Sequence, residues 1–550
     1  MKTENCTHLK ALTFLALLAF AGVLPAQTVM LNLTDMTPHL GQKFEARLID
    51  KRTLKEVDRT SMAAIPDAVF SVNLEGEVGG SYFVDFYADL NQNGVYDAPP
   101  ADHAWRLSAD NLQAGNNMVN FQHNTTFTDI DWRYLLTLDF QDMNPHVGQM
   151  LGVRVRSVTR VGKEVGRVYV ASIPGPEFTV ELPFLELGHS YLVEFFADLN
   201  QNGLYDAPPT DHVWRETLDD VAGDATITFV HGTNFTDVGW TNLLTVNLTD
   251  MVPHVGQLLE LRVLENGSER EIGRIKRMID VADLAVEIPG IQDGKEYKVD
   301  FYADLNQNGL YNAPPMDHAW RLDLKDRPPG DASLDFSHNT TFTDIEWEYL
   351  LTLNLNDMNP HVGQKFELRL VETDPGDDEI ARFSMPAILK PHFIVCVPGL
   401  QVGSSYNVDF YADLNQNGTY DAPPTDHAWR LPLTDDEGDE TLDFDHNTTF
   451  TDIMFPTALR ELHVLTSLTL SPNPFHDGFL LDLQSEQPLK LDISLLDAQG
   501  RPVRSLARAF SFTGESTLEF QGLSDLPAGT YFLLLQNEDG AGKVKTLLKK

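Results

Sequence analysis

The sequence contains very little cysteine, with only Cys6 and Cys396 among 550 residues. Cys6 lies in an N-terminal segment that we expect to be removed, so the mature chain cannot form an intrachain disulfide. We expect Cys396, in the apolar run FIVCV, to be a buried strand residue. An extracellular protein without disulfides must gain its stability from large apolar cores or from bound metal ions.

Positive charge is also scarce. The chain has 40 lysines and arginines against 81 aspartates and glutamates, which gives a formal charge of −41 at pH 7. Such a surface argues against nucleic acid and anionic membranes as partners. The sequence also lacks a nucleophile elbow, an HExxH zinc motif and a phosphate-binding loop, so we predict that the protein is not an enzyme.

The long apolar run is confined to the N-terminus. Residues 1–27 combine a lysine-bearing start, an apolar run from Ala11 to Leu24, and Pro25 and Ala26 before Gln27. This pattern is typical of a secretory signal peptide, and it is too short for a spanning helix. No second apolar stretch follows, so we expect an exported chain without a transmembrane segment.

One stretch, ADLNQNGVYDAPPADHAWR from Ala88 to Arg106, returns three more times in nearly the same letters. The first aspartates of the four copies are 109, 106 and 109 residues apart, at Asp89, Asp198, Asp304 and Asp413. Solenoid units repeat every ~20 to 50 residues, so this longer interval predicts a tandem array of whole domains. The predicted boundaries are 28–133, 134–241, 242–348 and 349–455 for repeats 1 to 4, 456–467 for a linker, and 468–550 for a C-terminal domain.

Each repeat shows short segments of alternating apolar and polar residues and no convincing helix. In repeat 1 these segments are 29–36, 43–50, 58–65, 68–75, 81–90, 103–110 and 117–124. The pattern predicts an all-β fold in which every repeat is an antiparallel β-sandwich. The spacing LxxGxxY, as in Leu185 to Tyr191 and Leu400 to Tyr406, resembles the tyrosine corner of immunoglobulin-like and fibronectin type III-like sandwiches.

The repeated stretch also contains the spacing DxNxNGxxD. Alternate oxygen side chains, a glycine that permits a sharp turn and a following backbone carbonyl suit a hard cation such as Ca²⁺. The loop resembles the first nine positions of an EF-hand or dockerin-type calcium loop, but Pro100 stands where the bidentate glutamate would be, and Asp102 is our candidate substitute. The alternative is an Asn-Gly turn that carries solubilising acids.

The candidate calcium ligands occupy the same six places in every repeat. They are Asp89, Asn91, Asn93, Val95, Asp97 and Asp102; Asp198, Asn200, Asn202, Leu204, Asp206 and Asp211; Asp304, Asn306, Asn308, Leu310, Asn312 and Asp317; and Asp413, Asn415, Asn417, Thr419, Asp421 and Asp426. The third copy has Asn312 where the others have aspartate, so we expect its site to be the weakest.

Twelve of the 17 histidines fall in three repeated places. They are His39, His103 and His123; His146, His212 and His231; His254, His318 and His338; and His361, His427 and His446. If seven strands alternate in direction, all three places lie at the pole of the calcium loop. Three imidazoles there would suit zinc or copper with an open fourth position. The alternative is that the histidines order the loops through hydrogen bonds.

The C-terminal segment carries SPNPF at Ser471–Phe475, DAQGRPV at Asp497–Val503 and LPAGTYFLLL at Leu526–Leu535. In itself it predicts another small β-sandwich. Its motifs are similar in order and spacing to the type A sorting domain of type IX secretion substrates. This resemblance implies handling by the type IX secretion machinery, passage across the outer membrane, and then release or attachment at the cell surface.

Three functions remain open on these observations. The first is a secreted or surface-attached, calcium-stabilised array for adhesion, whose partner is an extracellular protein or glycan. The second is a copper or zinc protein for metal capture or redox chemistry. The third is carbohydrate binding, although the sequence shows no exposed aromatic platform.

Overall fold

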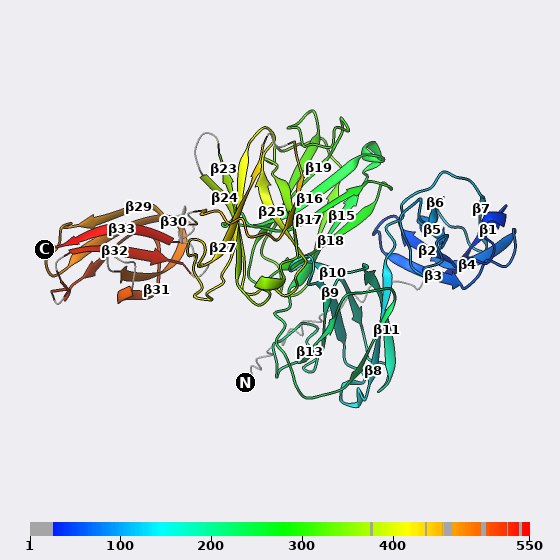
Figure 1. Ribbon diagram of the computed structural model, residues 1–550, viewed down its shortest axis with the longest axis horizontal. Helices are drawn as coiled ribbons and strands as arrows, with labels where there is room; N and C mark the ends of the chain where they lie inside the picture. Colours follow the sequence, from blue (N-terminus) through cyan, green and yellow to red (C-terminus); the bar gives the residue numbers. More distant parts are fainter. Residues whose placement is uncertain are drawn as a thin grey trace, which may run out of the picture. The chain divides into compact units, whose positions relative to one another are not determined.

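The computed structural model describes residues 26–373, 378–434, 437–453, 455, 465–496, 502–524, 526–527, 529–537 and 542–550. The predicted signal peptide therefore lies outside the described residues except for 26 and 27, and most of the predicted linker does too. Figure 1 shows the described chain as strands joined by turns and loops. Among these residues, no helix has the length and apolar character needed to cross a membrane.

The strands of the described chain fall into four similar groups and a C-terminal set. Repeat 1 has β1 (Ala26–Thr34), η1 (Thr37–His39), β2 (Phe44–Asp50), β3 (Glu56–Met62), β4 (Phe70–Glu77), β5 (Tyr82–Ala88), β6 (His103–Ala109) and β7 (Asn117–Gln122). Repeat 2 has β8 (Tyr134–Gln141), η2 (Asn144–His146), β9 (Leu151–Ser157), β10 (Glu164–Val170), β11 (Phe178–Leu185), β12 (Tyr191–Ala197), β13 (His212–Leu218) and β14 (Ala225–Val230).

The later groups follow the same order. Repeat 3 has β15 (Asn242–Thr249), η3 (Val252–His254), β16 (Leu258–Glu265), β17 (Glu271–Met278), β18 (Leu284–Ile291), β19 (Tyr297–Ala303), β20 (His318–Leu324) and β21 (Ala332–Ser337). Repeat 4 has β22 (Tyr349–Asn356), η4 (Asn359–His361), β23 (Phe366–Glu372), β24 (Asp378–Met385), β25 (Phe393–Leu400), β26 (Tyr406–Ala412), β27 (His427–Leu433) and β28 (Glu440–Asp445).

The chain forms two compact units. One holds the described residues through Gly363 together with Glu367–Val408 and Leu431–Asn447. The other holds Gln364–Phe366, Asp409–Arg430 and the described residues from Thr448 onward. Repeats 1 to 3 therefore lie wholly in the first unit, and the strands of repeat 4 are divided between the two.

Repeat 1 consists of a three-stranded sheet, β4-β1-β7, and a four-stranded sheet, β3-β2-β5-β6. Repeats 2 and 3 have the same orders, which confirms the predicted all-β sandwich class. One pair departs from a wholly antiparallel arrangement, because β1 and β7 run parallel, with Leu31 beside Val119. The chain crosses from one sheet to the other between β6 and β7, so β7 pairs with the first strand rather than with its predecessor.

The core of repeat 1 lies between its two sheets. Val29, Leu31 and Leu33 of β1 are fully buried and belong to one apolar cluster with Phe44 of β2 and Phe86 of β5. These residues follow the predicted alternation, because every second side chain of a strand points to the same face. Burying this apolar surface is the main favourable term in the folding of each sandwich.

The predicted tyrosine corner is present in every repeat. The Tyr191 hydroxyl accepts a hydrogen bond from the backbone N–H of Glu186 at 2.8 Å, and the equivalent bond to Tyr82 is 2.9 Å long. The corner forms in repeat 1 although Gly76 replaces the leucine of the pattern. The hydroxyl and the turn backbone are therefore sufficient for this contact.

The segment after β7 folds back over the outer face of the four-stranded sheet. Its backbone N–H at Thr128 donates to the Ala104 carbonyl at 2.9 Å, and the Trp132 ring lies between the guanidinium groups of Arg47 and Arg59, 4.7 Å from each. Trp240 and Trp347 are held between two arginines in the same way. The segment thus covers the buried charges of Arg47 and Asp85 before the next repeat begins.

The loop between β5 and β6 contacts the following repeat. The hydroxyl of Tyr134, the first residue of β8, accepts a hydrogen bond from the backbone N–H of Tyr96 at 2.7 Å. Tyr96 and Val95 pack with the apolar cluster of repeat 2. The candidate calcium loop therefore lies at the junction between successive repeats.

The C-terminal set contains β29 (Leu465–Ser471), β30 (Phe479–Leu496), β31 (Pro502–Phe520), β32 (Gly529–Gln536) and β33 (Gly542–Lys549). The sequence predicts a small sandwich here. The described strands are hydrogen-bonded into one sheet, and this sheet has an apolar core of its own. The pairing of the long strands β30 and β31 shifts register at several places, for example between Ser485 and Leu489.

The prediction for Cys396 is wrong. Its thiol is exposed on β25, whereas the side chains of Val395 and Val397 on either side are buried. The run FIVCV is apolar on both faces of the strand, so its pattern does not reveal which face the cysteine occupies.

Two equivalent glycines give a matched test of the junction. A Cβ added at Gly330 would lie 2.7 Å from Leu204 Cδ2 of the preceding repeat, whereas one added at Gly115 would meet nothing within 4 Å. Both have positive φ, +100° and +103°. Gly330→Ala should therefore destabilise the chain by about 1 kcal/mol more than Gly115→Ala, because only it overpacks a contact. Calorimetric unfolding checks this, and equal losses in the two variants would contradict the described junction.

Candidate metal centres

The loop after β5 is held in shape by its own side chains. In repeat 1, Asp89 Oδ2 accepts a hydrogen bond from the Gly94 N–H at 2.9 Å, and Asn91 Oδ1 accepts one from the Asn93 N–H at 3.0 Å. The other repeats have the same first bond, at 2.8 Å, from Gly203, Gly309 and Gly418. Gly94 has φ of +88°, which suits glycine at this turn.

The carboxylate of Asp97 lies opposite the two asparagines. Its Oδ2 accepts hydrogen bonds of 2.7 Å from both Asn91 Nδ2 and Asn93 Nδ2. In repeat 3, Asn312 Oδ1 accepts the same two bonds at 2.6 and 2.8 Å. A cation that entered the loop would therefore have to displace the amide groups from this acceptor.

Asp102 ties the two ends of the loop together. Its Oδ1 accepts from the Leu90 N–H at 2.9 Å and its Oδ2 from the Asp97 N–H at 2.8 Å. The side chain is fully buried, and this burial raises the pKa of Asp102 above its ordinary value, while the backbone donors oppose the rise. Asp211, Asp317 and Asp426 make the same pair of bonds. Asp102 thus holds the two ends of the loop together through hydrogen bonds.

The loop has oxygen donors of the kind that bind calcium, but these donors do not form a preformed coordination site. Asp89 is only 2% exposed, and its Oδ1 has no hydrogen-bond partner among the described residues. A buried carboxylate oxygen without a partner costs free energy, and a hard cation would satisfy it. Within the described residues, however, the carboxylates of Asp89, Asp97 and Asp102 do not form a cluster with all ligand atoms within 4.8 Å.

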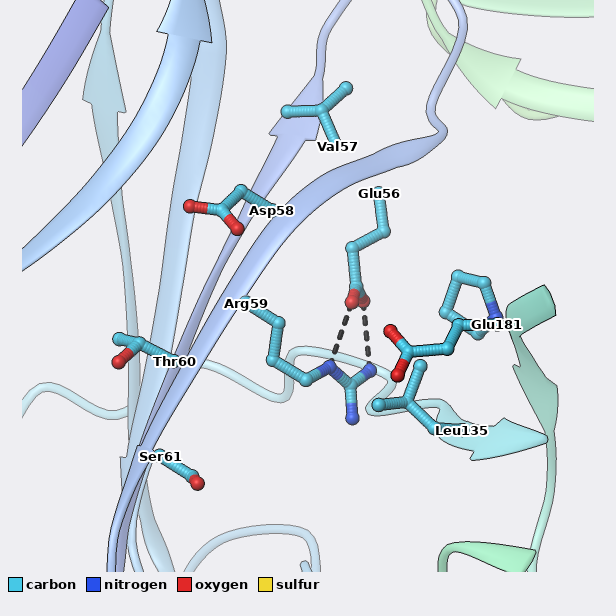
Figure 2. A pocket seen from close by; sticks show the side chains of 9 residues that line it. Glu56, Val57, Asp58, Arg59, Thr60, Ser61, Leu135 and Glu181 are labelled. Atoms are coloured by element: carbon cyan, nitrogen blue, oxygen red, sulfur yellow. Dashed lines mark hydrogen bonds and ion pairs between the residues drawn. The ribbon is translucent and has the colours of Figure 1, made fainter. Parts of the chain in front are cut away.

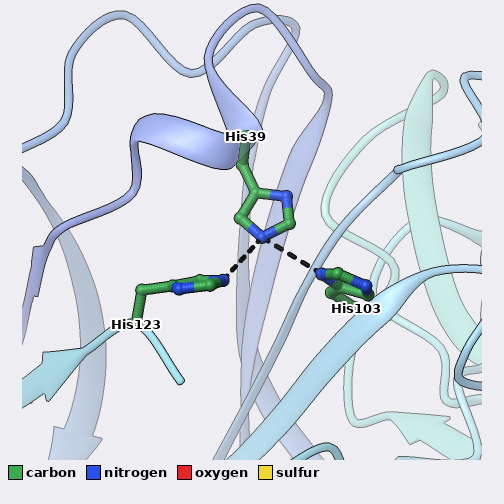
Figure 3. Close-up of side chains that lie close together, drawn as sticks. All are labelled: His39, His103 and His123. Atoms are coloured by element: carbon green, nitrogen blue, oxygen red, sulfur yellow. Dashed lines mark hydrogen bonds between the residues drawn. The ribbon is translucent and has the colours of Figure 1, made fainter. Parts of the chain in front are cut away.

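The three histidines of repeats 1 to 3 do converge. Figure 3 shows His39 between its two neighbours: its Nε2 lies 3.1 Å from His123 Nε2 and 3.3 Å from His103 Nδ1. The same two distances are 3.1 and 3.1 Å around His146 and 3.2 and 3.3 Å around His254. All ligand atoms of a set lie within 4.8 Å of one another. His39 closes η1, His103 begins β6 and His123 follows β7, as the alternation of strands predicts.

The fourth set is divided between the two compact units. His361 and His446 lie in one unit, with their Nε2 atoms 3.1 Å apart. His427 lies in the other unit and stacks on Phe450 with ring centroids 4.0 Å apart. The corresponding ring in repeat 1, His103, stacks on Phe127 at the same distance.

A glutamine that the sequence reasoning passed over orients the central histidine. His39 Nδ1 lies 2.7 Å from Gln42 Oε1, and Gln42 Nε2 lies 3.5 Å from the Pro38 carbonyl. Gln149 and Gln257 make the same pair of contacts in repeats 2 and 3. The signal was available, because a glutamine follows the histidine by three residues in every MxPHxGQ motif.

The surroundings favour neutral imidazoles. His39 is fully buried, and this burial lowers its pKa, as do the neighbouring rings of His103 and His123. Burial also lowers the pKa of His103. An imidazole needs to be neutral to offer a nitrogen lone pair to a metal ion.

A hollow of about 350 Å³ lies between β3 of repeat 1 and strands β8 and β11 of repeat 2 (Figure 2). Glu56 and Arg59, both on β3, pair along one wall of it, with Nε–Oε1 at 2.7 Å. The lining residues Glu56–Ser61, Leu135, Glu181 and Pro183 include no histidine or cysteine. Nothing in this lining resembles a nucleophile with its activating base.

Asp102→Asn tests whether the Asp102 carboxylate holds the loop closed. The substituted amide would place an NH₂ group against one of the two backbone donors, so the loop should lose about 1–3 kcal/mol of local stability. Hydrogen exchange of the peptide that spans the loop, measured in chelator, should become faster. Asp97→Asn is the control, because repeat 3 already has asparagine there with the same contacts. Equal effects of the two variants would contradict the assigned roles.

The following solved structures are remotely similar to this chain. A Bacillus anthracis TIE protein is 8% identical, with 74% of this chain and 68% of that chain covered and a TM-score of 0.14. A streptococcal ancillary pilin is 10% identical, with 57% and 99% covered and a TM-score of 0.13. A C-terminally truncated tip fimbrial protein from Porphyromonas gingivalis is 10% identical, with 36% and 83% covered and a TM-score of 0.14. At these scores the likeness supports no conclusion about a ligand, and no curated protein matches the chain.

The C-terminal segment has a clear relative. Residues 469–550 match the family model described as a secretion system C-terminal sorting domain, which confirms the resemblance seen in the sequence of this segment. The sorting domain implies handling by the type IX secretion machinery, so the protein is secreted or attached to the cell surface.

Proposed function

We propose that this exported chain is an adhesion protein whose repeats each offer one contact surface to an extracellular protein or glycan, and that it is not an enzyme. The observation that carries the proposal is an apolar side chain kept exposed at the same loop position of all four repeats. Leu90 is 36% exposed, and Leu199, Leu305 and Leu414 are each 38% exposed. One exposed leucine is ordinary, but its return in every copy indicates a use.

A second exposed apolar residue lies close by in each of repeats 1 to 3. It directly follows the buried histidine of the η turn: Leu40, Val147 and Val255 are 47–48% exposed. The turn and the loop are adjacent, because the Asp89 N–H donates to the Lys43 carbonyl at 3.0 Å. We call the paired exposed residues, Leu40 and Leu90 in repeat 1 and their equivalents, the pole surface.

The pole surfaces gain binding strength because they are repeated along one chain. A single pair of small apolar residues provides little binding energy, since burial contributes only ~25 cal/mol per Å² of apolar surface. Several weak contacts on one chain raise the apparent affinity, because later contacts form at a high effective concentration. The formal charge of −41 favours a partner with a neutral or basic surface.

Calcium is proposed as a brace for these loops. Asp89, with its buried unpartnered oxygen, and the carbonyl of Val95 would hold the ion together with asparagine oxygens. An ion there would fix the loop that carries Leu90 and that meets the next repeat through Tyr96. The loop of repeat 2 has no lysine like Lys43, whose Nζ lies 2.9 Å from the Gly94 carbonyl, but its Asp198 Oδ1 already accepts a hydrogen bond from the Asn202 N–H at 3.2 Å.

Removal of the loop leucines tests the adhesion proposal. The quadruple variant Leu90→Ser, Leu199→Ser, Leu305→Ser and Leu414→Ser should lose about 100-fold or more in apparent affinity for any matrix protein or glycan that the full chain binds in a panel, because avidity is lost. Each single variant should lose far less. The control is Met118→Ser, since Met118 is 65% exposed on β7, away from the pole. Undiminished binding by the quadruple variant would refute the proposal.

Calcium dependence has its own test. Calorimetric unfolding of the full chain in chelator, followed by addition of calcium alone, should raise Tm by several degrees, because ~2.7 kcal/mol is gained when free ion is at 100 times Kd. The variant Asp97→Asn, Asp206→Asn and Asp421→Asn should reduce this rise, and Asn312→Asp should increase it. Identical melting with and without calcium would refute the proposal that calcium stabilises the loops, and the adhesion proposal would still stand.

A further inference from the structure

We propose that the histidine set of each of repeats 1 to 3 binds one zinc or copper ion, with the glutamine of the same turn as the positioning residue. In repeat 1 the ligands are His39 Nε2, His103 Nδ1 and His123 Nε2. This site is separate from the calcium loop, and its existence does not depend on the adhesion role.

The glutamine fixes which nitrogen of His39 faces the other rings. Because Gln42 Nε2 points to the Pro38 carbonyl, its Oε1 is the atom that faces His39 Nδ1. An amide oxygen only accepts hydrogen bonds, so Nδ1 carries the proton and Nε2 presents its lone pair to the other two histidines. Metal-binding histidines are held in this way, with the second ring nitrogen donating to a neighbouring group.

Hydrogen bonds alone satisfy this arrangement poorly. The single lone pair of His39 Nε2 faces nitrogens of two different rings, at 3.1 and 3.3 Å. If both nitrogens are protonated, two donors compete for one acceptor; if one is not, two lone pairs face each other. A metal ion among the three atoms would accept a lone pair from each ring.

The spacing suits such an ion. With zinc–nitrogen bonds of ~2.0–2.1 Å, two ligands of a tetrahedral ion lie about 3.3–3.4 Å apart. The observed nitrogen separations around the three central histidines are 3.1 to 3.3 Å. Small rotations of the rings would complete the coordination.

The donor set selects the class of metal. Three imidazole nitrogens without a carboxylate suit zinc and copper, whereas calcium and magnesium prefer oxygen. His103 and His123 are partly exposed, so water or another ligand can reach the fourth position. Three protein ligands with an open position are also the pattern of reactive zinc sites.

The location gives the ion a structural consequence. His39 and His123 adjoin strands β1 and β7 of one sheet, and His103 begins β6 of the other. An ion held by all three therefore joins the two sheets at one pole, which no disulfide does among the described residues. His103 also directly follows Asp102, which holds the two ends of the loop together, so this ion would restrain the end of the loop as well.

The test is a titration of the purified full chain with zinc sulfate and, separately, copper sulfate, after treatment with chelator and in excess calcium. We expect tight binding with at least one ion for each intact set. The variant His103→Ala, His212→Ala and His318→Ala replaces the partly exposed ligands and should lose three of these ions. The matched control, His392→Ala, removes an exposed histidine outside the sets and should lose none.

A second variant separates ligation from folding. Gln42→Ala, Gln149→Ala and Gln257→Ala should weaken metal binding by about 10–100-fold while keeping the stoichiometry, as loss of an outer hydrogen bond does. Copper-loaded protein should show coupling to three imidazole nitrogens in electron paramagnetic resonance. Binding that is unchanged in the histidine variant, or no stronger than that of surface histidines, would overturn the proposal and assign the sets to hydrogen-bonded ordering of the loops.

Discussion

One buried carboxylate organises the pole of each repeat. Asp102 accepts backbone hydrogen bonds from the beginning and the end of the loop, at Leu90 and Asp97, and this closure fixes everything between them. It turns Asp89 inward, exposes Leu90 and directs Tyr96 toward the next repeat. The residue after Asp102 is a histidine of the convergent set. A single side chain thus links the candidate calcium loop, the candidate transition-metal site and the junction.

Polar contacts at the pole and the outer face complement the apolar core, and the part of the chain that the structure describes contains no disulfide. The core residues of β1, β2 and β5 hold the two sheets together at their centre, while the histidines join them at one end. On the outer face, Arg47 pairs with Asp85 under the ring of Trp132. Equivalent contacts recur in repeats 2 and 3, so these sandwiches are closed in the same way before the chain passes on.

The sequence alone was enough for the sandwich class and for the placement of the histidines at one pole, because both follow from residue alternation and strand direction. The LxxGxxY spacing was enough for the tyrosine corner, whereas the convergence of the histidines stayed open. It was not enough for features that depend on which face or partner a side chain meets. The outward orientation of Cys396 could not be predicted because its strand is apolar on both sides, and the parallel pairing of β7 arises because the chain changes sheet. The spacing shows that Gln42 follows His39 by three residues, but its role depends on an amide orientation that spacing does not encode.

The central proposal is that calcium binds the loops at the poles of the repeats and that the histidine sets of repeats 1 to 3 each bind a zinc or copper ion. Crystals of the chain grown with calcium and zinc, and measured at wavelengths on either side of the zinc absorption edge, test it most directly. The account predicts zinc ~2.0–2.1 Å from three histidine nitrogens and calcium ~2.3–2.6 Å from Asp89 Oδ1. Anomalous density confined to scattered surface carboxylates, with the pole free of both ions, would contradict it.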